Sequence, residues 1–348
     1  MLIIGCDFHT RFQQIAMVDT ETGELTERRV EHRDGEAKEF YAGLEKPVRV
    51  GMEATGFSQW FEHMLANLGH ELWVGNAADI RAAMVRKQKT DARDAKHILD
   101  LMLQNRFPQI WIPSVAERDL RQLLRHRHKM VGFRTSVRNQ LHALAMGQGI
   151  CRKRKLWTVA GRAELEAIAL EPWARRRRQE LLEMLDRLDG SLPELDRAVA
   201  KEAEQCPAAC SLMKEPGVGP ITALAFVLTI GPVERFHRSK QVVSYLGLNP
   251  IESSSGGRQR LGAISKQGNS MMRFLLVEAA MTGARDNEAL RRNYQRLKFR
   301  RGSGVAKVAM ARKLAVRLYW NLRQQSVLPA RMQGSPARFL VGENLPSY

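Results

Sequence analysis

The sequence predicts an α/β N-terminal domain with a mixed sheet, followed by a helical coiled-coil arm and a mostly α-helical C-terminal domain. The first hundred residues alternate short apolar runs with helical patterns, whereas the apolar spacing beyond Ser114 is helical throughout long segments. The balance of charge changes close to this position. Residues 1–104 hold 13 Lys and Arg against 17 Asp and Glu, whereas residues 105–348 hold 42 Lys and Arg against 20 Asp and Glu. We expect domains at 1–110, 111–205 and 206–330, with a tail at 331–348.

The N-terminal domain is expected to contain five strands. Three adjacent strands, then strands interleaved with helices, indicate a mixed sheet covered by helices. The strands are expected at residues 2–8, 13–19, 25–32, 48–53 and 70–76, and the helices near 35–45, at 57–68 and after Thr90, which is a good N-cap.

Two long helical runs predict the arm. The first opens with a capping box of Ser114 and Glu117 and spaces its apolar residues helically. The second covers about 173–205 and is expected to be interrupted near Gly190 and Pro193, because both residues disfavour helix. Together the two runs predict an antiparallel helical arm or coiled coil.

The third region begins near Cys206. Gly217-Val218-Gly219 lies between two apolar helices, as in a helix-hairpin-helix whose backbone amides bind a phosphate; a simple turn between packed helices explains it equally well. A loop rich in Ser, Gly and Arg then separates two further apolar helices, and a basic amphipathic helix follows near residues 304–323.

Composition narrows the class of protein. No apolar run is long enough to span a bilayer and the first residues lack the basic lead of a signal peptide, so we expect a soluble cytoplasmic protein with no membrane partner. The four cysteines lack the spacing of a zinc site. The net charge of +18, spread over many segments beyond residue 105, favours nucleic acid over a membrane surface as partner.

Four acidic residues predict a metal centre. Asp7 ends the first strand, Glu53 ends the fourth, and Asp91 and Asp94 lie one helical turn apart on the helix after the fifth. Such carboxylates could bind two Mg²⁺ or Mn²⁺ ions for phosphoryl transfer, and their order along the chain is that of ribonuclease-H-like nucleases. Simple helix capping remains an alternative for the two aspartates of the helix. His9 and His97 are close to the acids in sequence and are left out of the expected site.

Six short segments follow one another along the chain: "IGCDFH", "GMEATG", "KTDARDAKHI", "EPGVGPITALAF", "YLGLNP" with "SSGGRQRLGAISKQGNS", and "VAMARKLA". Together they resemble the DEDD-type transposases of the insertion sequence 110 family over essentially the whole chain. The resemblance implies a RuvC-like N-terminal domain, a coiled-coil linker and a C-terminal transposase domain with a catalytic serine. It also implies a bacterial recombinase that acts on DNA at the nucleoid, joining element ends to a target under the direction of a structured RNA. The family's acids map onto Asp7, Glu53, Asp91 and Asp94.

The resemblance points to Ser255 as the nucleophile, with Ser254 and Ser253 as alternatives in the same run. A Ser-Ser-Ser-Gly-Gly run is by itself typical of a flexible linker. A serine attacking phosphate would form a phosphoserine that conserves the bond energy for rejoining. Three basic residues nearby could stabilise the phosphorane charge: Arg258, Arg260 and Lys266.

Three functions are therefore open. The first is a metal-dependent recombinase that assembles as a dimer or tetramer through the coiled coil. The second is a Holliday-junction-resolving nuclease, in which the acids activate water and the serine loop only binds phosphate. The third is a non-enzymatic binder of structured RNA or DNA.

Overall fold

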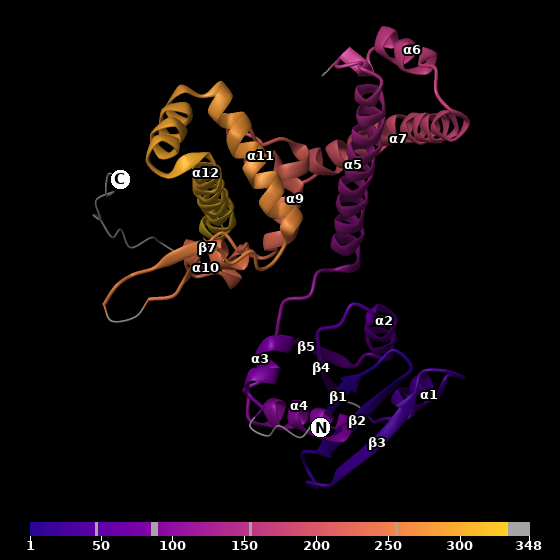
Figure 1. Cartoon of the computed structure of the whole chain (residues 1–348). Coiled ribbons are helices and arrows are strands. Elements are labelled where there is room, and N and C mark those ends of the chain that lie inside the picture. The colour runs from indigo at the N-terminus through magenta and orange to yellow at the C-terminus, as the bar shows by residue number, and fades with distance from the viewer. Residues whose placement is uncertain (46–47, 85–89, 153–154, 255–256, 333–348) are drawn as a thin grey trace. The chain divides into compact units, whose positions relative to one another are not determined.

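The computed structural model describes residues 1–45, 48–84, 90–152, 155–254 and 257–332, with side chains up to residue 326 (Figure 1). The chain divides into two compact units: unit 1 is Met1–Pro113, and unit 2 begins at Ser114. Unit 2 contains both the predicted arm and the predicted C-terminal region; the finer division of the chain into domains stays a prediction.

Unit 1 is built on a five-stranded mixed sheet, as predicted (Figure 1). The strands lie in the order β3-β2-β1-β4-β5. The first three form an antiparallel meander, while β1–β4 and β4–β5 are parallel pairs. Their bounds are β1 Leu2–Phe8, β2 Phe12–Asp19, β3 Leu25–Glu31, β4 Val48–Glu53 and β5 Glu71–Gly75.

Helices cover both faces of this sheet, because alternate residues of a strand point to opposite faces. On one face Ile4 and Cys6 of β1 share a core with Tyr41 of α1 and Phe61 of α2. On the other face Ile3 packs in the core that α4 forms. The helices of unit 1 are α1 Glu36–Ala42, α2 Gln59–Leu68, α3 Ala77–Ala82 and α4 Asp91–Leu103.

Two glycines let α4 lie close to the sheet. Gly5 of β1 and Gly51 of β4 are partners in the parallel register. A Cβ atom on Gly5 would lie 2.2 Å from the carbonyl oxygen of Ala95, and one on Gly51 would lie 2.2 Å from the Sδ atom of Met102. No other residue type fits at Gly5 without moving α4.

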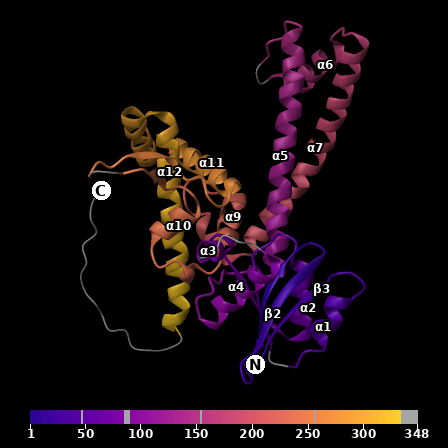
Figure 2. The same cartoon turned by 60° about the horizontal axis from the view of Figure 1, so that its bottom comes forward.

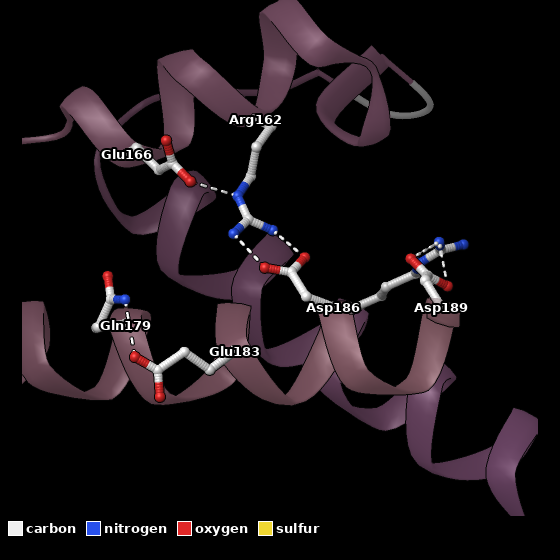
Figure 3. A network of polar contacts seen from close by, with 7 residues as sticks. Arg162, Glu166, Gln179, Glu183, Asp186 and Asp189 are labelled. Carbon is white, nitrogen blue, oxygen red and sulfur yellow. Dashed lines mark hydrogen bonds and ion pairs between the residues drawn. The ribbon is translucent and has the colours of Figure 1, made fainter. Parts of the chain in front are cut away.

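The arm of unit 2 is a helical hairpin. α5 (Val115–Gly147) and α7 (Pro172–Glu204) run side by side (Figure 2), and the capping box of Ser114 and Glu117 is confirmed. Between them lie η1 (Lys155–Trp157) and α6 (Val159–Ala167). The guanidinium of Arg162 on α6 donates to both carboxylate oxygens of Asp186 on α7 at 2.9 Å, which ties α6 to the hairpin (Figure 3).

The predicted interruption of the second arm helix is wrong. α7 continues through Gly190 and Pro193 to Glu204. Pro193 is exposed, whereas Leu188 and Leu192 on either side of Gly190 are buried. Burial of the apolar face thus outweighs the local preference of glycine and proline against helix.

The rest of unit 2 is mostly helical, as predicted, and forms one large core. The loop expected between two apolar helices instead contains a short antiparallel hairpin of β6 and β7. The closing helix, α12, bends at Gly302, where φ is +80°. The elements are α8 Pro207–Leu212, α9 Pro220–Ile230, η2 Val233–Arg235, α10 Ser239–Tyr245, β6 Pro250–Glu252, β7 Leu261–Ile264, α11 Ser270–Asp286 and α12 Glu288–Met332.

None of the helices in the described ranges combines the length and apolar character that crossing a bilayer requires.

Candidate metal centre and serine loop

Two of the four predicted acids end adjacent parallel strands. The β1–β4 register pairs Gly5 with Gly51 and Cys6 with Met52, so the next pair is Asp7 and Glu53. Both acids lie two residues beyond a glycine that faces α4, and their side chains therefore point to the α4 face of the sheet. Each strand thus carries the sequence Gly-x-acid. The glycine lets α4 lie close to the sheet, and the acid places a carboxylate near the end of the strand.

The other two acids occupy the first turn of α4. Thr90 caps this helix by accepting a hydrogen bond from the Arg93 amide, so capping does not require either aspartate. Asp91 is half exposed, but Asp94 is only 9 % exposed. An aspartate that served only the helix dipole would stay in water, because burying a carboxylate is costly. The burial of Asp94 therefore favours a role in the site over capping.

His9 joins Asp7 and Asp91. Its Nε2 atom lies 3.1 Å from Oδ2 of Asp7 and 3.6 Å from Oδ1 of Asp91. One ligand atom from each of the three residues lies within 4.8 Å of the others, close enough to share one metal ion. Sequence reasoning left His9 out because a histidine is usually an ordinary surface residue; its position two residues after a strand-ending acid was the available signal.

The pKa of the Asp7 carboxyl is raised overall, because burial and the neighbouring aspartates outweigh His9. Burial raises the pKa of the Asp7 carboxyl, the nearby His9 lowers it, and the charges of Asp94 and Asp91 raise it. Asp94, buried one helical turn from Asp91, is therefore near enough for its charge to act on Asp7. Negative charges that are held together in this way are stabilised by a bound cation.

Glu53 lies beside this group without joining its closest members. Its Oε1 atom lies 3.6 Å from the guanidinium of Arg81, and its side chain is 39 % exposed. His97, the other histidine near the acids, lies 3.0 Å through Nε2 from the carbonyl oxygen of Ile80, which links α4 to α3. The structure thus brings Asp7, Asp91 and Asp94 together and leaves Glu53 at the adjacent strand end.

The serine run lies at the β6–β7 hairpin of unit 2. The Ser253 amide donates to the carbonyl of Arg260, which extends the pairing beyond the strands. The Ser254 hydroxyl donates to Glu252 at 2.5 Å and accepts from the Arg260 amide at 3.2 Å. Ser255 lies outside the described residues.

The basic residues predicted to assist the serine belong to the same segment. Arg258 and Arg260 are exposed near the hairpin. Lys266, also exposed, has a left-handed backbone with φ of +55°, and its amide donates to the carbonyl of Gly247. Their roles toward a phosphate stay predictions.

Gly217 is explained by packing between helices. Its φ is +82°, and a Cβ atom there would lie 2.2 Å from the carbonyl oxygen of Ala279 on α11. Gly283 on α11 makes a matching close approach to Pro216. Gly219 is the N-cap of α9. A turn between packed helices accounts for Gly217, and phosphate binding by Gly217 and Gly219 stays a prediction.

Comparison with known proteins decides the family. A model for the DEDD domain of IS110-type transposases matches residues 4–147, and a model described as the transposase IS116/IS110/IS902 family matches residues 209–295. The chain belongs to the IS110 family of transposases. The first model spans all four predicted acids, and the second spans the serine run and the three basic residues.

Relatives of this family match along almost the whole chain. A probable family 20 transposase of Pseudomonas aeruginosa is 29% identical over 92% of this chain and 96% of its own length. The transposase for insertion sequence element IS1111A of Coxiella burnetii is 29% identical over 93% of this chain and 90% of its own. The transposase for IS1328 of Yersinia enterocolitica is 26% identical over 81% and 85%. The chain is thus a transposase, an enzyme of DNA phosphoryl transfer with a RuvC-like DEDD domain.

Proposed function

We propose that this IS110-family chain cleaves and rejoins DNA strands as a recombinase, using the DEDD acids with Mg²⁺ or Mn²⁺ and a phosphoserine at Ser255. The observation that carries the proposal is the meeting of Asp7 and Asp91 at His9, with Asp94 and Glu53 beside them. Water-exposed acids serving only solubility would spread apart instead of gathering at one sheet edge.

The donor set fits a divalent cation. Carboxylate oxygens suit Mg²⁺ and Mn²⁺, and the imidazole of His9 adds a ligand type that transition metals bind more readily than Mg²⁺ does. Asp7, His9 and Asp91 would hold one ion, while Glu53 and Asp94 would complete the centre. When bound, the metal would polarise the phosphodiester and neutralise the charge that develops on it.

The protein's own side chains would have distinct roles. Asp7 and Glu53 would be fixed by two hydrogen-bonded strands, which keeps their spacing rigid. When no metal is bound, Nε2 of His9 would donate a hydrogen bond to Asp7 and so hold it beside Asp91. Arg81, whose guanidinium lies 3.6 Å from Oε1 of Glu53, would hold that carboxylate in position when no metal is bound.

Ser255 would act as the nucleophile. Its hydroxyl loses a proton, its oxygen bonds to phosphorus, and the bond from phosphorus to one deoxyribose oxygen breaks as that oxygen takes a proton. Attack by a deoxyribose hydroxyl of a second strand reverses these steps and releases the serine. The pairing of Ser253 and Ser254 within the hairpin favours Ser255 among the three.

Trapping the covalent adduct tests the proposal. Wild-type protein with Mg²⁺ and element-end DNA should give a protein–DNA adduct whose modified peptide carries Ser255. Ser255→Ala should abolish it, whereas Ser253→Ala should retain it. In Asp7→Asn and Asp91→Asn the rate of strand cleavage should fall at least about a thousandfold, because metal activation contributes several kcal/mol to catalysis.

The runner-up function is a junction-resolving nuclease that shares the same acids. In that case strand cleavage would persist in Ser255→Ala and leave free 5′-phosphate ends. Non-enzymatic binding would be indicated if the wild-type protein gave no more strand products than Asp7→Asn does.

We also propose that a structured RNA encoded by the element guides target choice and that the protein works as a homo-oligomer in the bacterial nucleoid. The basic surplus beyond residue 105 supports a polyphosphate partner. Sequencing the RNA that copurifies with the protein should return one structured species; random cellular RNA would contradict the guide.

A further inference from the structure

A cavity in unit 2 contains none of the predicted site residues. It has a volume of about 430 Å³ and opens among α5, α9, α10 and the start of α11. This volume is within the range of sites that hold small ligands. The polar side chains that line it are Arg121, Arg125, Thr229, Tyr245, Asn269 and Ser270.

The lining of the cavity is positively charged. Arg121 and Arg125 are four residues apart on α5, so they lie on the same face of the helix. None of the described residues lining the cavity is acidic. Asp119 lies two residues before Arg121 and therefore on another face of α5. Glu117, one turn before Arg121, accepts the Ser114 amide at 2.7 Å in the capping box.

A third arginine strengthens this charge. Arg235 lies with its guanidinium 4.8 Å from the ring centre of Tyr245. Burial lowers the pKa of Arg121, while Tyr245 and Glu117 raise it and the charges of Arg125 and Arg235 lower it. Arg121 is therefore close enough to Arg125 and to Arg235 for their charges to repel its own, and an anion bound beside Arg121 would be stabilised.

The side chain of Arg121 is held by a hydrogen bond, whereas that of Arg125 is exposed to solvent. The Nε atom of Arg121 donates at 3.0 Å to the carbonyl of Leu228, another residue that lines the cavity. Asn269 and Ser270, at the start of the 17-residue helix α11, also line the cavity, so the dipole of α11 adds positive potential there.

We propose that this cavity binds one unpaired nucleotide of a nucleic-acid strand, with the phosphate at Arg121 and Arg125 and the base against Tyr245. A free phosphate would leave most of the cavity empty, and a paired base would first have to leave its stack, which costs free energy that an unpaired base does not lose. Aromatic rings beside arginines are the usual means of binding single strands. The inference rests on the proposed function in one respect, namely that the protein binds DNA or RNA with unpaired nucleotides.

A pair of charge-matched variants tests this site. Arg125→Gln and Lys129→Gln each remove one positive charge from successive turns of α5, but Lys129 does not line the cavity. For a labelled single strand, Arg125→Gln should weaken binding about tenfold and reduce the salt slope by ~0.7, as expected for one lost phosphate contact. Lys129→Gln should change both values much less. Equal losses in the two variants would overturn the proposal.

Tyr245 provides a second, independent test. Tyr245→Leu should weaken single-strand binding about tenfold through lost stacking, whereas Tyr245→Phe should retain it. Each variant is compared by thermal unfolding, and photo-crosslinking of wild-type protein to a thymine-rich strand should label Tyr245 even if Tyr245→Leu folds poorly. Absence of that crosslink would contradict the proposal.

The choice of probe separates the sources of the nucleotide. Losses confined to unpaired DNA assign a DNA strand, and losses confined to unpaired RNA assign an RNA strand. Equal losses with fully paired duplex DNA would show ordinary surface attraction and overturn the site. Failure of Asp7→Asn to abolish strand cleavage would refute the proposed function but leave these binding results unaffected.

Discussion

Asp7 combines burial with negative neighbours, and this combination has a cost in the absence of metal. Because folding raises the pKa of Asp7, its carboxylate destabilises the metal-free protein at neutral pH. That penalty disappears as the pH falls through the raised folded-state value, where the carboxyl becomes neutral. We expect Asp7→Asn to increase the free energy of unfolding of unit 1 by about 1 kcal/mol at pH 7 without metal, and the gain to shrink at lower pH.

Thermal unfolding with and without divalent cation checks this prediction. Excess Mg²⁺ should raise the midpoint of the wild type, because a ligand that binds only the folded state stabilises it. Asp7→Asn should show little response to Mg²⁺. A variant less stable than the wild type in chelator would contradict the stated role of Asp7.

We expect His9 to contribute to the affinity of the site for metal. His9→Ala should weaken Mn²⁺ binding by about 10–100-fold, whether it ligates the ion or orients the carboxylates. The loss should be smaller for Mg²⁺ if the imidazole is a ligand, since Mg²⁺ prefers oxygen. Titration calorimetry measures both affinities, with His63→Ala, an exposed histidine of α2, as control. Unchanged Mn²⁺ affinity in His9→Ala would exclude His9 from the centre.

Secondary-structure elements were predictable where the signal is local. The first strand at residues 2–8, the strand end at Glu53, the Thr90 cap and the Ser114 capping box depend on neighbouring residues, and each was predicted correctly. The continuous course of α7 through Pro193 was not predictable, because it depends on packing between distant helices. His9 was missed for the same reason, since α4 brings Asp91 to it from 82 residues away in sequence.

The β6–β7 hairpin was missed for a different reason. β6 and β7 contain only 3 and 4 residues, and the segment between them is rich in serine and glycine. Such short strands carry no clear alternation of apolar and polar residues.

The close packing of α4 on the sheet is expected to hold Asp91 and Asp94 in place. In Gly5→Ala the new methyl group would meet backbone atoms of Ala95 and Leu99, so α4 must move and carry Asp91 and Asp94 with it. We expect a loss of about 1–3 kcal/mol in unfolding free energy together with weaker metal binding. Gly51→Ala should cost less, because it meets the flexible side chain of Met102.

The control for this pair is Gly43→Ala, whose new Cβ atom would come no nearer than 3.4 Å to any atom. Circular dichroism melts and metal titration should rank the variants Gly43→Ala, Gly51→Ala and Gly5→Ala in order of increasing damage. Normal metal affinity in a folded Gly5→Ala protein would refute the link between this packing and the site.

Charge is divided unequally over the whole molecule. Residues 1–104 carry a net charge of −4, and residues 105–348 carry +22. Nucleic-acid binding should therefore reside mainly in the second part and weaken by orders of magnitude between about 50 and 200 mM salt. Filter binding with the full chain and with a fragment of unit 1 checks this; a fragment that binds duplex DNA as tightly as the full chain would contradict it.

The proposed reaction requires the acids and Ser255 to act on the same DNA strand. The acids belong to unit 1 and Ser255 lies some 160 residues beyond Asp94, in unit 2. Because the acids and Ser255 belong to different units, a second chain paired through the arm can supply the missing group. We propose that the acids of one chain act with the serine of another. Mixing Glu53→Gln protein with Ser255→Ala protein should then restore strand joining that neither shows alone, because each retains what the other lacks. Strand joining is followed on labelled DNA, and mixed oligomers are verified with two affinity tags; continued inactivity in verified mixed oligomers would rule out assembly in trans.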